Sequence, residues 1–388
     1  MPLSKIQTAV ITDNAITTAK VNADAITDAK LASNAVTTAK IAADAVTNAK
    51  VGNDVIGPEN IAGTVPFGRR NMLINGDFQL WQRGTSGTVN SYTCDRWYGW
   101  GNQHNLTQQQ AENGTHNSGR FALRVAHNDG TSNTFSSIAQ TLETKDAAQC
   151  RGKKVTFSID VKKGSAFTGS LTLQIVTRTD AEGTINTGTR QVLVTEDITS
   201  SLTTSLQRFT CTTSSVCAQN IRVIGVNINH TGTSGTDANN FFQVERAQLE
   251  IGENATPFET ESFSENSRRC YRYYFRQNMT IYDVYAMGHV NSTNKPRLLF
   301  PLPVPMRALP TITRGADVFH LWHNAAGNIV QIHNPVRAYM NSSRTEITTV
   351  YIDHDASGTI ASSTYPIALT TYHASGTANS YYAFESEF

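Results

Sequence analysis

Ile11-Thr-Asp-Asn-Ala-Ile16-Thr-Thr-Ala-Lys20 is the first of four ten-residue blocks that follow one another as far as Lys50. Each block opens with a branched apolar residue, carries a second one five positions later and ends in Ala-Lys. Self-similarity at a fixed period predicts a quasi-linear, repetitive structure. The apolar positions of the four blocks are Ile11, Ile16, Val21, Ile26, Leu31, Val36, Ile41 and Val46.

A spacing of five residues between apolar side chains fits neither a helix nor a flat strand. On a helix each step turns by about 140°, so the apolar side chains spiral around the axis. On a strand an odd step sends alternate side chains to opposite faces. One copy buries too little apolar surface to offset the ordering of its backbone. We therefore predict a parallel homotrimeric shaft with these residues at its core; the alternative is a disordered, low-complexity linker.

The composition favours an all-β virion or extracellular protein over a helical enzyme. Only 16% of the 388 residues are charged and 39% are hydrophobic, while Thr, Ser, Asn and Gly are abundant. The net charge of +1 argues against a nucleic-acid partner. The sequence has no apolar run of transmembrane length and no signal peptide, so we expect synthesis in a cytosol without membrane insertion. The five cysteines lack zinc-site spacing, which predicts buried free thiols.

The middle of the chain shows the period-two pattern of half-buried strands. Residues 155–162 alternate apolar and polar side chains, and residues 121–125 and 171–175 repeat the pattern. After Val244 the apolar set changes register, which predicts a β-bulge. Short strands separated by polar turns predict a two-sheet sandwich or jelly roll.

Several motifs in this region resemble bacteriophage tail fibres. The stretch from Asn71 to Gly84 (NMLINGDFQLWQRG), followed by Tyr92-Thr-Cys-Asp-Arg-Trp97, resembles the opening of their jelly-roll domains. Residues 244–252 and 255–259 are similar to the closing strand and exit of that domain, and residues 269–274 (RCYRYY) to the segment that follows it. The Ala-Val-Thr-Thr-Ala-Lys repeats are also typical of such fibres. The resemblance implies a jelly roll related to carbohydrate-binding modules.

The C-terminal third also carries mostly strand signals. Ser262-Phe-Ser-Glu265 is a capping-box pattern, which predicts a short helix through Cys270. Alternating prolines in residues 300–310 require an extended chain and predict an edge strand or a subunit contact. Strands are predicted at 281–287, 297–302, 346–352 and 381–384.

The predicted fold class is therefore all-β: a trimeric fibrous shaft, a β-sandwich or jelly-roll domain, and a β-rich tip domain. The predicted parts are an N-terminal attachment segment (1–10), a decad-repeat shaft (11–60), a linker (61–70), a jelly-roll carbohydrate-binding-like domain (71–260) and a C-terminal β tip (261–388).

Candidate binding residues are aromatic side chains near amides, because sugar C–H faces stack on aromatic rings while polar groups bind hydroxyls. Trp81 and Trp97 lie in strand motifs and are predicted to be core residues. The glycan-binding candidates are Tyr98 and Trp100 in the jelly roll, and His320, Trp322 and Asn324 in the tip.

Metal and catalytic signals are weak. The resemblance to carbohydrate-binding modules implies a structural calcium ion, for which Asp77 and Glu250 are the candidate ligands, although calcium takes six or more oxygens. We expect no other cofactor. The sequence has no nucleophile motif and no phosphate-binding glycine loop, so we expect that the chain is not an enzyme.

Together these features predict a bacteriophage tail fibre that attaches the virion to a host surface polysaccharide through several weak sites. Its N-terminus would bind other virion tail or adaptor proteins, and the fibre would reside in the virion after assembly in the host cytoplasm. One alternative is a purely structural connector or decoration fibre. Another is a capsule depolymerase, which would bring two carboxylates to roughly 5–10 Å from each other.

Overall fold

The computed structural model divides into two units, residues 1–67 and 68–388. In the first unit the structure describes isolated positions only, and Ile11, Ile16 and Ile26 of the predicted shaft core lie outside them. The other five shaft positions are 37–59% exposed. The described residues are 17, 21, 27, 31, 35–37, 40, 41, 45, 46, 69–88, 90–102, 105–110, 121–127, 130, 135–233, 235–278, 285–292, 295–315, 319–323, 329–339, 347–356, 367–371 and 381–387.

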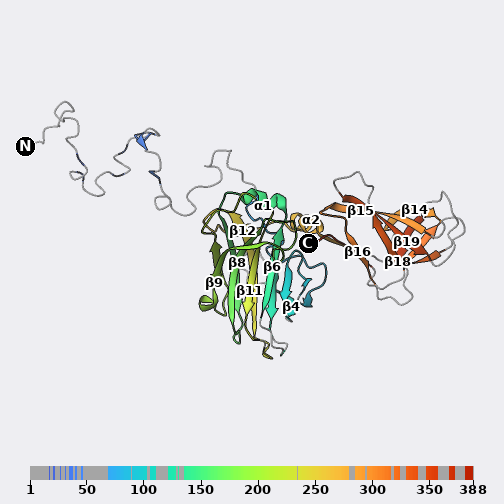
Figure 1. The fold of residues 1–388 in the computed structure, drawn as a ribbon, viewed down its shortest axis with the longest axis horizontal. Helices are drawn as coiled ribbons and strands as arrows, with labels where there is room; N and C mark the ends of the chain where they lie inside the picture. The colour runs from blue at the N-terminus through green and yellow to red at the C-terminus, as the bar shows by residue number, and fades with distance from the viewer. Residues whose placement is uncertain are drawn as a thin grey trace, which may run out of the picture. The chain divides into compact units, whose positions relative to one another are not determined.

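Two six-stranded antiparallel sheets form a sandwich in the first part of the second unit, and Figure 1 shows β9, β8, β11 and β6 side by side. Sheet 1 has the order β1 (Ser86–Thr88), β4 (Asn105–Gln110), β5 (Phe121–Ala126), β12 (Phe241–Ile251), β7 (Val155–Lys163) and β10 (Gln207–Thr212). Sheet 2 has the order β2 (Ser91–Tyr92), β3 (Tyr98–Gly101), β6 (Ser136–Leu142), β11 (Val223–Thr231), β8 (Ser170–Arg178) and β9 (Arg190–Asp197).

The alternating pattern of the sequence builds the sandwich core. The alternate side chains of β7 from Val155 to Val161, and of β8 from Leu171 to Ile175, are apolar and fully buried between the two sheets, as a half-buried strand requires. The predicted bulge is confirmed, because the pairing of β12 with β7 shifts between Glu245 and Gln248. Trp97 is a core residue, as predicted, and its indole donates a hydrogen bond to the carbonyl of Asn75 (2.9 Å). Trp81 is half-buried and packs against the same core.

All five cysteines are buried and free, as the sequence predicts. The described helices are short: α1 (Thr144–Cys150), α2 (Phe263–Tyr271) and the 3-10 turn η7 (Thr199–Ser201). The capping-box prediction is confirmed, since the hydroxyl of Ser262 accepts a hydrogen bond from the backbone amide of Glu265 (3.3 Å). Among the described residues, the helices all fall short of the length and apolarity that a membrane span requires.

Six strands after α2 close into a barrel, and three others form a small sheet. The barrel order is β14 (Ala286–Ser292), β15 (Lys295–Met306), β19 (Ile347–Ala356), β18 (Ile329–Tyr339), β17 (Phe319–His323) and β20 (Ile367–Thr371). The small sheet has the order β13 (Tyr274–Asn278), β21 (Tyr381–Glu385) and β16 (Thr311–Arg314). Nearly every described strand pairs antiparallel, so the all-β fold class is confirmed.

The proline-rich stretch, residues 300–310, has a partner strand on one side at most, as the prediction of an edge position requires. Its strand β15 pairs with β14 only through residues 295–299, before the stretch begins, and with β19 on the other side. The pairing with β19 stops after Pro301 and resumes at Met306. Prolines lack the amide donor that a ladder needs, and three of them fall beside or within this gap, so the barrel accommodates them by interrupting one ladder.

A buried ionic cluster joins the sandwich to the small sheet. The guanidinium of Arg96, from the sandwich, pairs with the carboxylate of Glu387 and lies over the ring of Tyr273 at 3.5 Å. Arg83 pairs with Asp95 (3.3 Å) and with Glu385 (3.1 Å). Arg96 and Glu387 are almost wholly buried, so each charge depends on the other for its stability.

Candidate functional site

Tyr98 and Trp100 lie together on the outer face of sheet 2. They are two residues apart on β3, so both side chains leave the strand on the same face. Gly99 between them faces the core, where a Cβ atom would lie 2.5 Å from Cδ1 of Leu106. The ring centroids of Tyr98 and Trp100 are 5.9 Å apart, with a tilt of 48°. Both side chains are partly exposed, so they present aromatic surface to solvent.

A third ring extends this surface. Tyr92 lies opposite Tyr98 in the pairing of β2 with β3, and their ring centroids are 4.9 Å apart in an edge-to-face arrangement. Burial raises the pKa of Tyr98. Its phenol is protonated at neutral pH, as in any tyrosine, and can donate a hydrogen bond. Tyr92 was not among the predicted binding residues, because its contact with Tyr98 depends on the register of a two-residue strand.

Carboxamide and hydroxyl side chains continue the same face away from the rings. The register places Ser137, Asn229 and Thr172 in one row with Trp100. The neighbouring row joins Tyr98 to Ala139, Asn227 and Gln174. Amides beside flat aromatic rings are the groups that a sugar-binding surface requires.

The loop that joins β8 to β9 (residues 179–189) bounds the outer face of sheet 2 on the side away from the three rings. Ile185 is fully buried in a small cluster with Ala139, Val176 and Val223. The amide of Asn227 donates a hydrogen bond to the side-chain oxygen of Asn186 (3.1 Å). Arg178 holds the loop in shape by pairing with Asp180 (2.9 Å). The exposed part of the face therefore lies between this loop and the three rings; we call it the aromatic surface.

Two of the three candidate residues of the tip lie on another sheet. His320 and Trp322 are on β17 of the barrel, where the register pairs them with residues 370 and 368 of β20. The structure describes the backbone of these two residues, and Asn324 lies outside the described residues. These three residues stay candidates.

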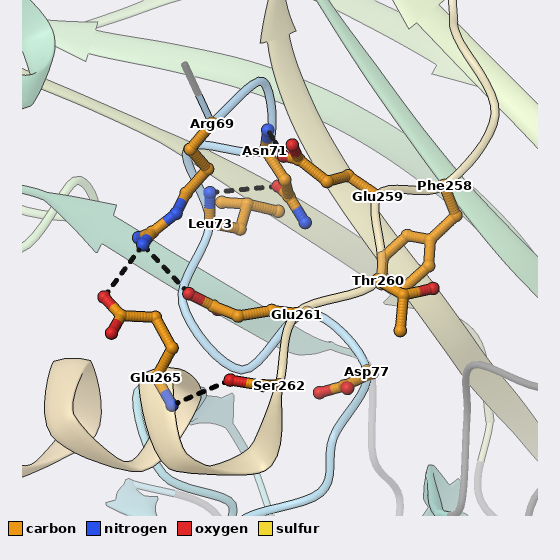
Figure 2. A pocket seen from close by; sticks show the side chains of 11 residues that line it. Arg69, Asn71, Leu73, Asp77, Phe258, Glu259, Thr260, Glu261, Ser262 and Glu265 are labelled. Atoms are coloured by element: carbon orange, nitrogen blue, oxygen red, sulfur yellow. Dashed lines mark hydrogen bonds and ion pairs between the residues drawn. The ribbon is translucent and has the colours of Figure 1, made fainter. Parts of the chain in front are cut away.

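Asp77 lines a pocket of about 280 Å³ that four carboxylates and one arginine surround (Figure 2). Its own carboxylate accepts hydrogen bonds from the side-chain amides of Gln79 (2.5 Å) and Asn266 (3.2 Å). Burial raises the pKa of Asp77 to about 6, since desolvation disfavours the charged form. We call this cavity the Asp77 pocket; its other charged residues are Arg69, Glu259, Glu261 and Glu265.

Those neighbouring carboxylates already bind protein groups. Glu259 accepts hydrogen bonds from the backbone amides of Arg70 (2.8 Å) and Asn71 (2.7 Å). Figure 2 shows Arg69 between Glu261 and Glu265, at 3.0 and 3.2 Å. These contacts link residues 69–71, at the start of the sandwich, to residues 259–265, which follow its last strand.

Asp77 and Glu250 do not fit a calcium site. Glu250 is absent from the lining of the Asp77 pocket. Its carboxylate instead accepts hydrogen bonds from the backbone amide (2.9 Å) and hydroxyl (2.7 Å) of Thr256. The part of the chain that the structure describes contains no group of three or more metal-binding side chains, whereas calcium takes six to eight oxygens.

Comparisons with known proteins find similar folds at low identity. No protein-family model and no curated protein sequence matches the chain. A Stig cyclase from Fischerella sp. TAU is 12% identical, with a TM-score of 0.35, and the match covers 48% of this chain and 98% of the cyclase. The enzymatically active domain of bacteriophage CBA120 tailspike protein 4 is 10% identical, with a TM-score of 0.31, over 47% of this chain and 21% of that one.

A family 22 carbohydrate-binding module from Clostridium thermocellum is also similar. It is 11% identical, with a TM-score of 0.31, and the match covers 49% of this chain and all of the module. The expectation that the chain is not an enzyme is corrected by these comparisons, because the similar structures are mostly enzymes. At these identities and TM-scores the likeness assigns no reaction to this chain.

Proposed function

We propose that this protein is a bacteriophage tail fibre that attaches the virion to a glycan on the host surface, and that the aromatic surface of sheet 2 binds the glycan. The observation that carries the proposal is the contact of Tyr92, Tyr98 and Trp100 on a face that also carries the partly exposed side chains of Thr172, Gln174 and Asn229. The ring faces would stack on the C–H faces of a sugar. Asn229 and Gln174 would bind its hydroxyls.

The proposal includes a homotrimer. The five described apolar positions of the repeats are all more than one-third exposed in the single chain, and sister copies packed around an axis would cover them. A trimer also presents three aromatic surfaces. Weak sites that are held together raise the overall affinity through their effective concentration. In this proposal residues 1–10 bind a virion tail or adaptor protein, and the fibre resides in the virion.

The test is binding of the full chain to an array of bacterial surface polysaccharides. Trp100→Ala and Tyr98→Ala should each weaken binding by about tenfold or more, because aromatic anchors dominate binding energy. Phe263→Ala is the matched control, since it removes an exposed ring from α2 outside the aromatic surface. Intact trimers that bind no polysaccharide, or a Trp100→Ala variant that binds as well as the wild type, would contradict the proposal. Trimers without any glycan binding would favour the connector fibre.

A glycan-cleaving activity is the second candidate, and the Asp77 pocket favours it. A carboxyl group with a pKa near 6 is suited to donate a proton to a leaving group at neutral pH, and Glu261 lines the same pocket. Release of reducing ends from capsule polysaccharide by the wild type, and its loss in Asp77→Asn, would support this candidate. Equal release by both proteins would exclude Asp77 as the acid.

A further inference from the structure

The outer face of sheet 1 carries a shallow depression of about 440 Å³. It lies on the sheet opposite to the aromatic surface, over β1, β4 and β5. Its lining consists of hydroxyl and carboxamide side chains with one arginine. We call it the Arg124 depression; its residues are Ser86, Gly87, Thr88, Asn105, Thr107, Gln109, Arg124 and Ala126.

The strand register explains why these side chains gather there. Ser86, Thr107 and Arg124 stand in one row across the three strands. Thr88, Asn105 and Ala126 form the next row of the same face. The side chains between these rows belong to Leu106 and Val125 and point into the core. All the polar groups of the two rows therefore face outward together.

Most of these polar groups are available to a ligand. Ser86, Thr88 and Asn105 are exposed. In the part of the chain that the structure describes, their side chains make no hydrogen bond to protein. Gln109 donates a hydrogen bond to the hydroxyl of Thr107 (3.2 Å), which orients that pair. Neighbouring hydroxyls and amides at the spacing of a β-sheet match a ligand with several hydroxyl groups.

Arg124 is held in a fixed orientation without an acidic partner. Its guanidinium lies over the ring of Phe241 at 3.8 Å and donates a hydrogen bond to the carbonyl of Ala238. Partial burial lowers the pKa of Arg124, which is the sign of a cation that has lost water without gaining an anion. On the same sheet, by contrast, Arg208 and Arg246 share the carboxylate of Asp160. Among the described residues Arg124 has no ion pair.

We propose that the Arg124 depression binds an acidic saccharide unit, with the sugar carboxylate on Arg124 and the ring hydroxyls on Ser86, Asn105 and Thr107. A stacked guanidinium loses little freedom when it binds a carboxylate, and the charge-assisted hydrogen bonds it makes are strong. The protein then has two distinct saccharide sites on opposite sheets: one that stacks sugar faces and one that selects a negative charge.

The test compares matched acidic and neutral ligands on the full-length protein by isothermal titration calorimetry. The probes are oligosaccharides that contain hexuronic acid or sialic acid, each beside its methyl ester. We expect the wild type to bind an acid about tenfold or more tightly than its ester. Arg124→Gln should abolish that preference, and Arg124→Lys should keep part of it. Arg222→Gln is the matched control, since it removes an exposed arginine elsewhere on the sandwich.

The outcomes separate this site from the aromatic surface. Trp100→Ala should weaken neutral glycans while the preference for acid over ester remains. Equal affinity for acids and esters in the wild type would overturn the proposal, as would a preference that survives in Arg124→Gln. Inorganic phosphate that competes as well as the acidic saccharides would overturn it too, since the depression would then be a simple anion site. An unchanged melting temperature of Arg124→Gln would show that the variant folds.

Discussion

The sandwich and the repeat segment differ in the exposure of their branched apolar residues. In β7 and β8 the alternate residues from Val155 to Val161 and from Leu171 to Ile175 are apolar and fully buried within one chain. In the repeats the apolar residues recur every fifth position, and those that the structure describes are all exposed, Val46 by as much as 59%. A period of two matches the two faces of a sheet, so one chain can bury the whole set. A period of five leaves the described part of that set exposed in the single chain, and in the proposed trimer other copies would cover it.

The two sheets of the sandwich differ in a second respect, although they share one core. The outer face of sheet 2 carries three aromatic rings in contact. The outer face of sheet 1 carries hydroxyls, amides and a stacked arginine instead. Outward positions are free of packing demands, so the same fold can hold two different surfaces. Three experiments can test how far burial and exposure explain these differences.

The largest expected effect is on the assembled mass. The wild type should have a solution mass near three times 42.4 kDa, because the exposed apolar positions would be covered by their copies. Val36→Asp combined with Val46→Asp should reduce this to the mass of one chain, since a buried ring of three carboxylates is strongly unfavourable. Sedimentation equilibrium or light scattering measures the change, and the melting temperature of the sandwich should stay the same.

Thr27→Asp combined with Thr37→Asp is the control for that experiment, because both threonines are exposed neighbours of the apolar positions. This variant should stay trimeric. A wild type that sediments as a single chain would refute the prediction for the repeats and leave the sandwich as an independent unit.

Local patterns predicted much of the fold. The alternation in residues 155–162 gave β7, the register change after Val244 gave the bulge, and Ser262 gave the start of α2. Each of these signals lies within a few neighbouring residues, where the backbone geometry decides which side chains share a face. Trp97 was placed in the core for the same reason.

Features that depend on pairing between distant strands could not be predicted. Arg124 shares a row with Ser86 and Thr107 only because β4 lies between β1 and β5. Tyr92 touches Tyr98 through a strand of two residues, too short to give a periodic signal. The edge position of the proline-rich stretch was predictable because missing amide donors are a local property, whereas the closed barrel that its strand enters depends on distant strands.

The second prediction concerns the buried cluster that joins the sandwich to the small sheet. Glu387→Gln should lower the free energy of unfolding by about 3 kcal/mol, because it leaves the buried guanidinium of Arg96 without its anion. Glu385→Gln removes a carboxylate from the same cluster, but this one is 41% exposed. Its cost should stay below about 1 kcal/mol. Urea denaturation measures both variants, and equal losses would show that burial does not govern the strength of these pairs.

The smallest effect concerns pH and two stacked histidines in the sandwich. His127 and His230 are buried with ring centroids 3.9 Å apart, between Phe167 and Phe242. Burial lowers the pKa of His230, so the folded protein holds a neutral ring while the unfolded chain binds a proton below about pH 6.5. The stability that this ring contributes is fully present above that pH.

As the pH falls below about 6.5 towards the lowered pKa of the folded state, that contribution should be lost, since protons then favour the unfolded chain. The free energy of unfolding of the wild type should therefore decline faster with acid than that of His230→Gln between pH 7 and 5.5. Glutamine keeps a donor for the carbonyl of Thr168, which His230 contacts at 2.7 Å. Parallel pH profiles of the two proteins would mean that the buried ring titrates as it does in water, and that burial in this core does not set its protonation.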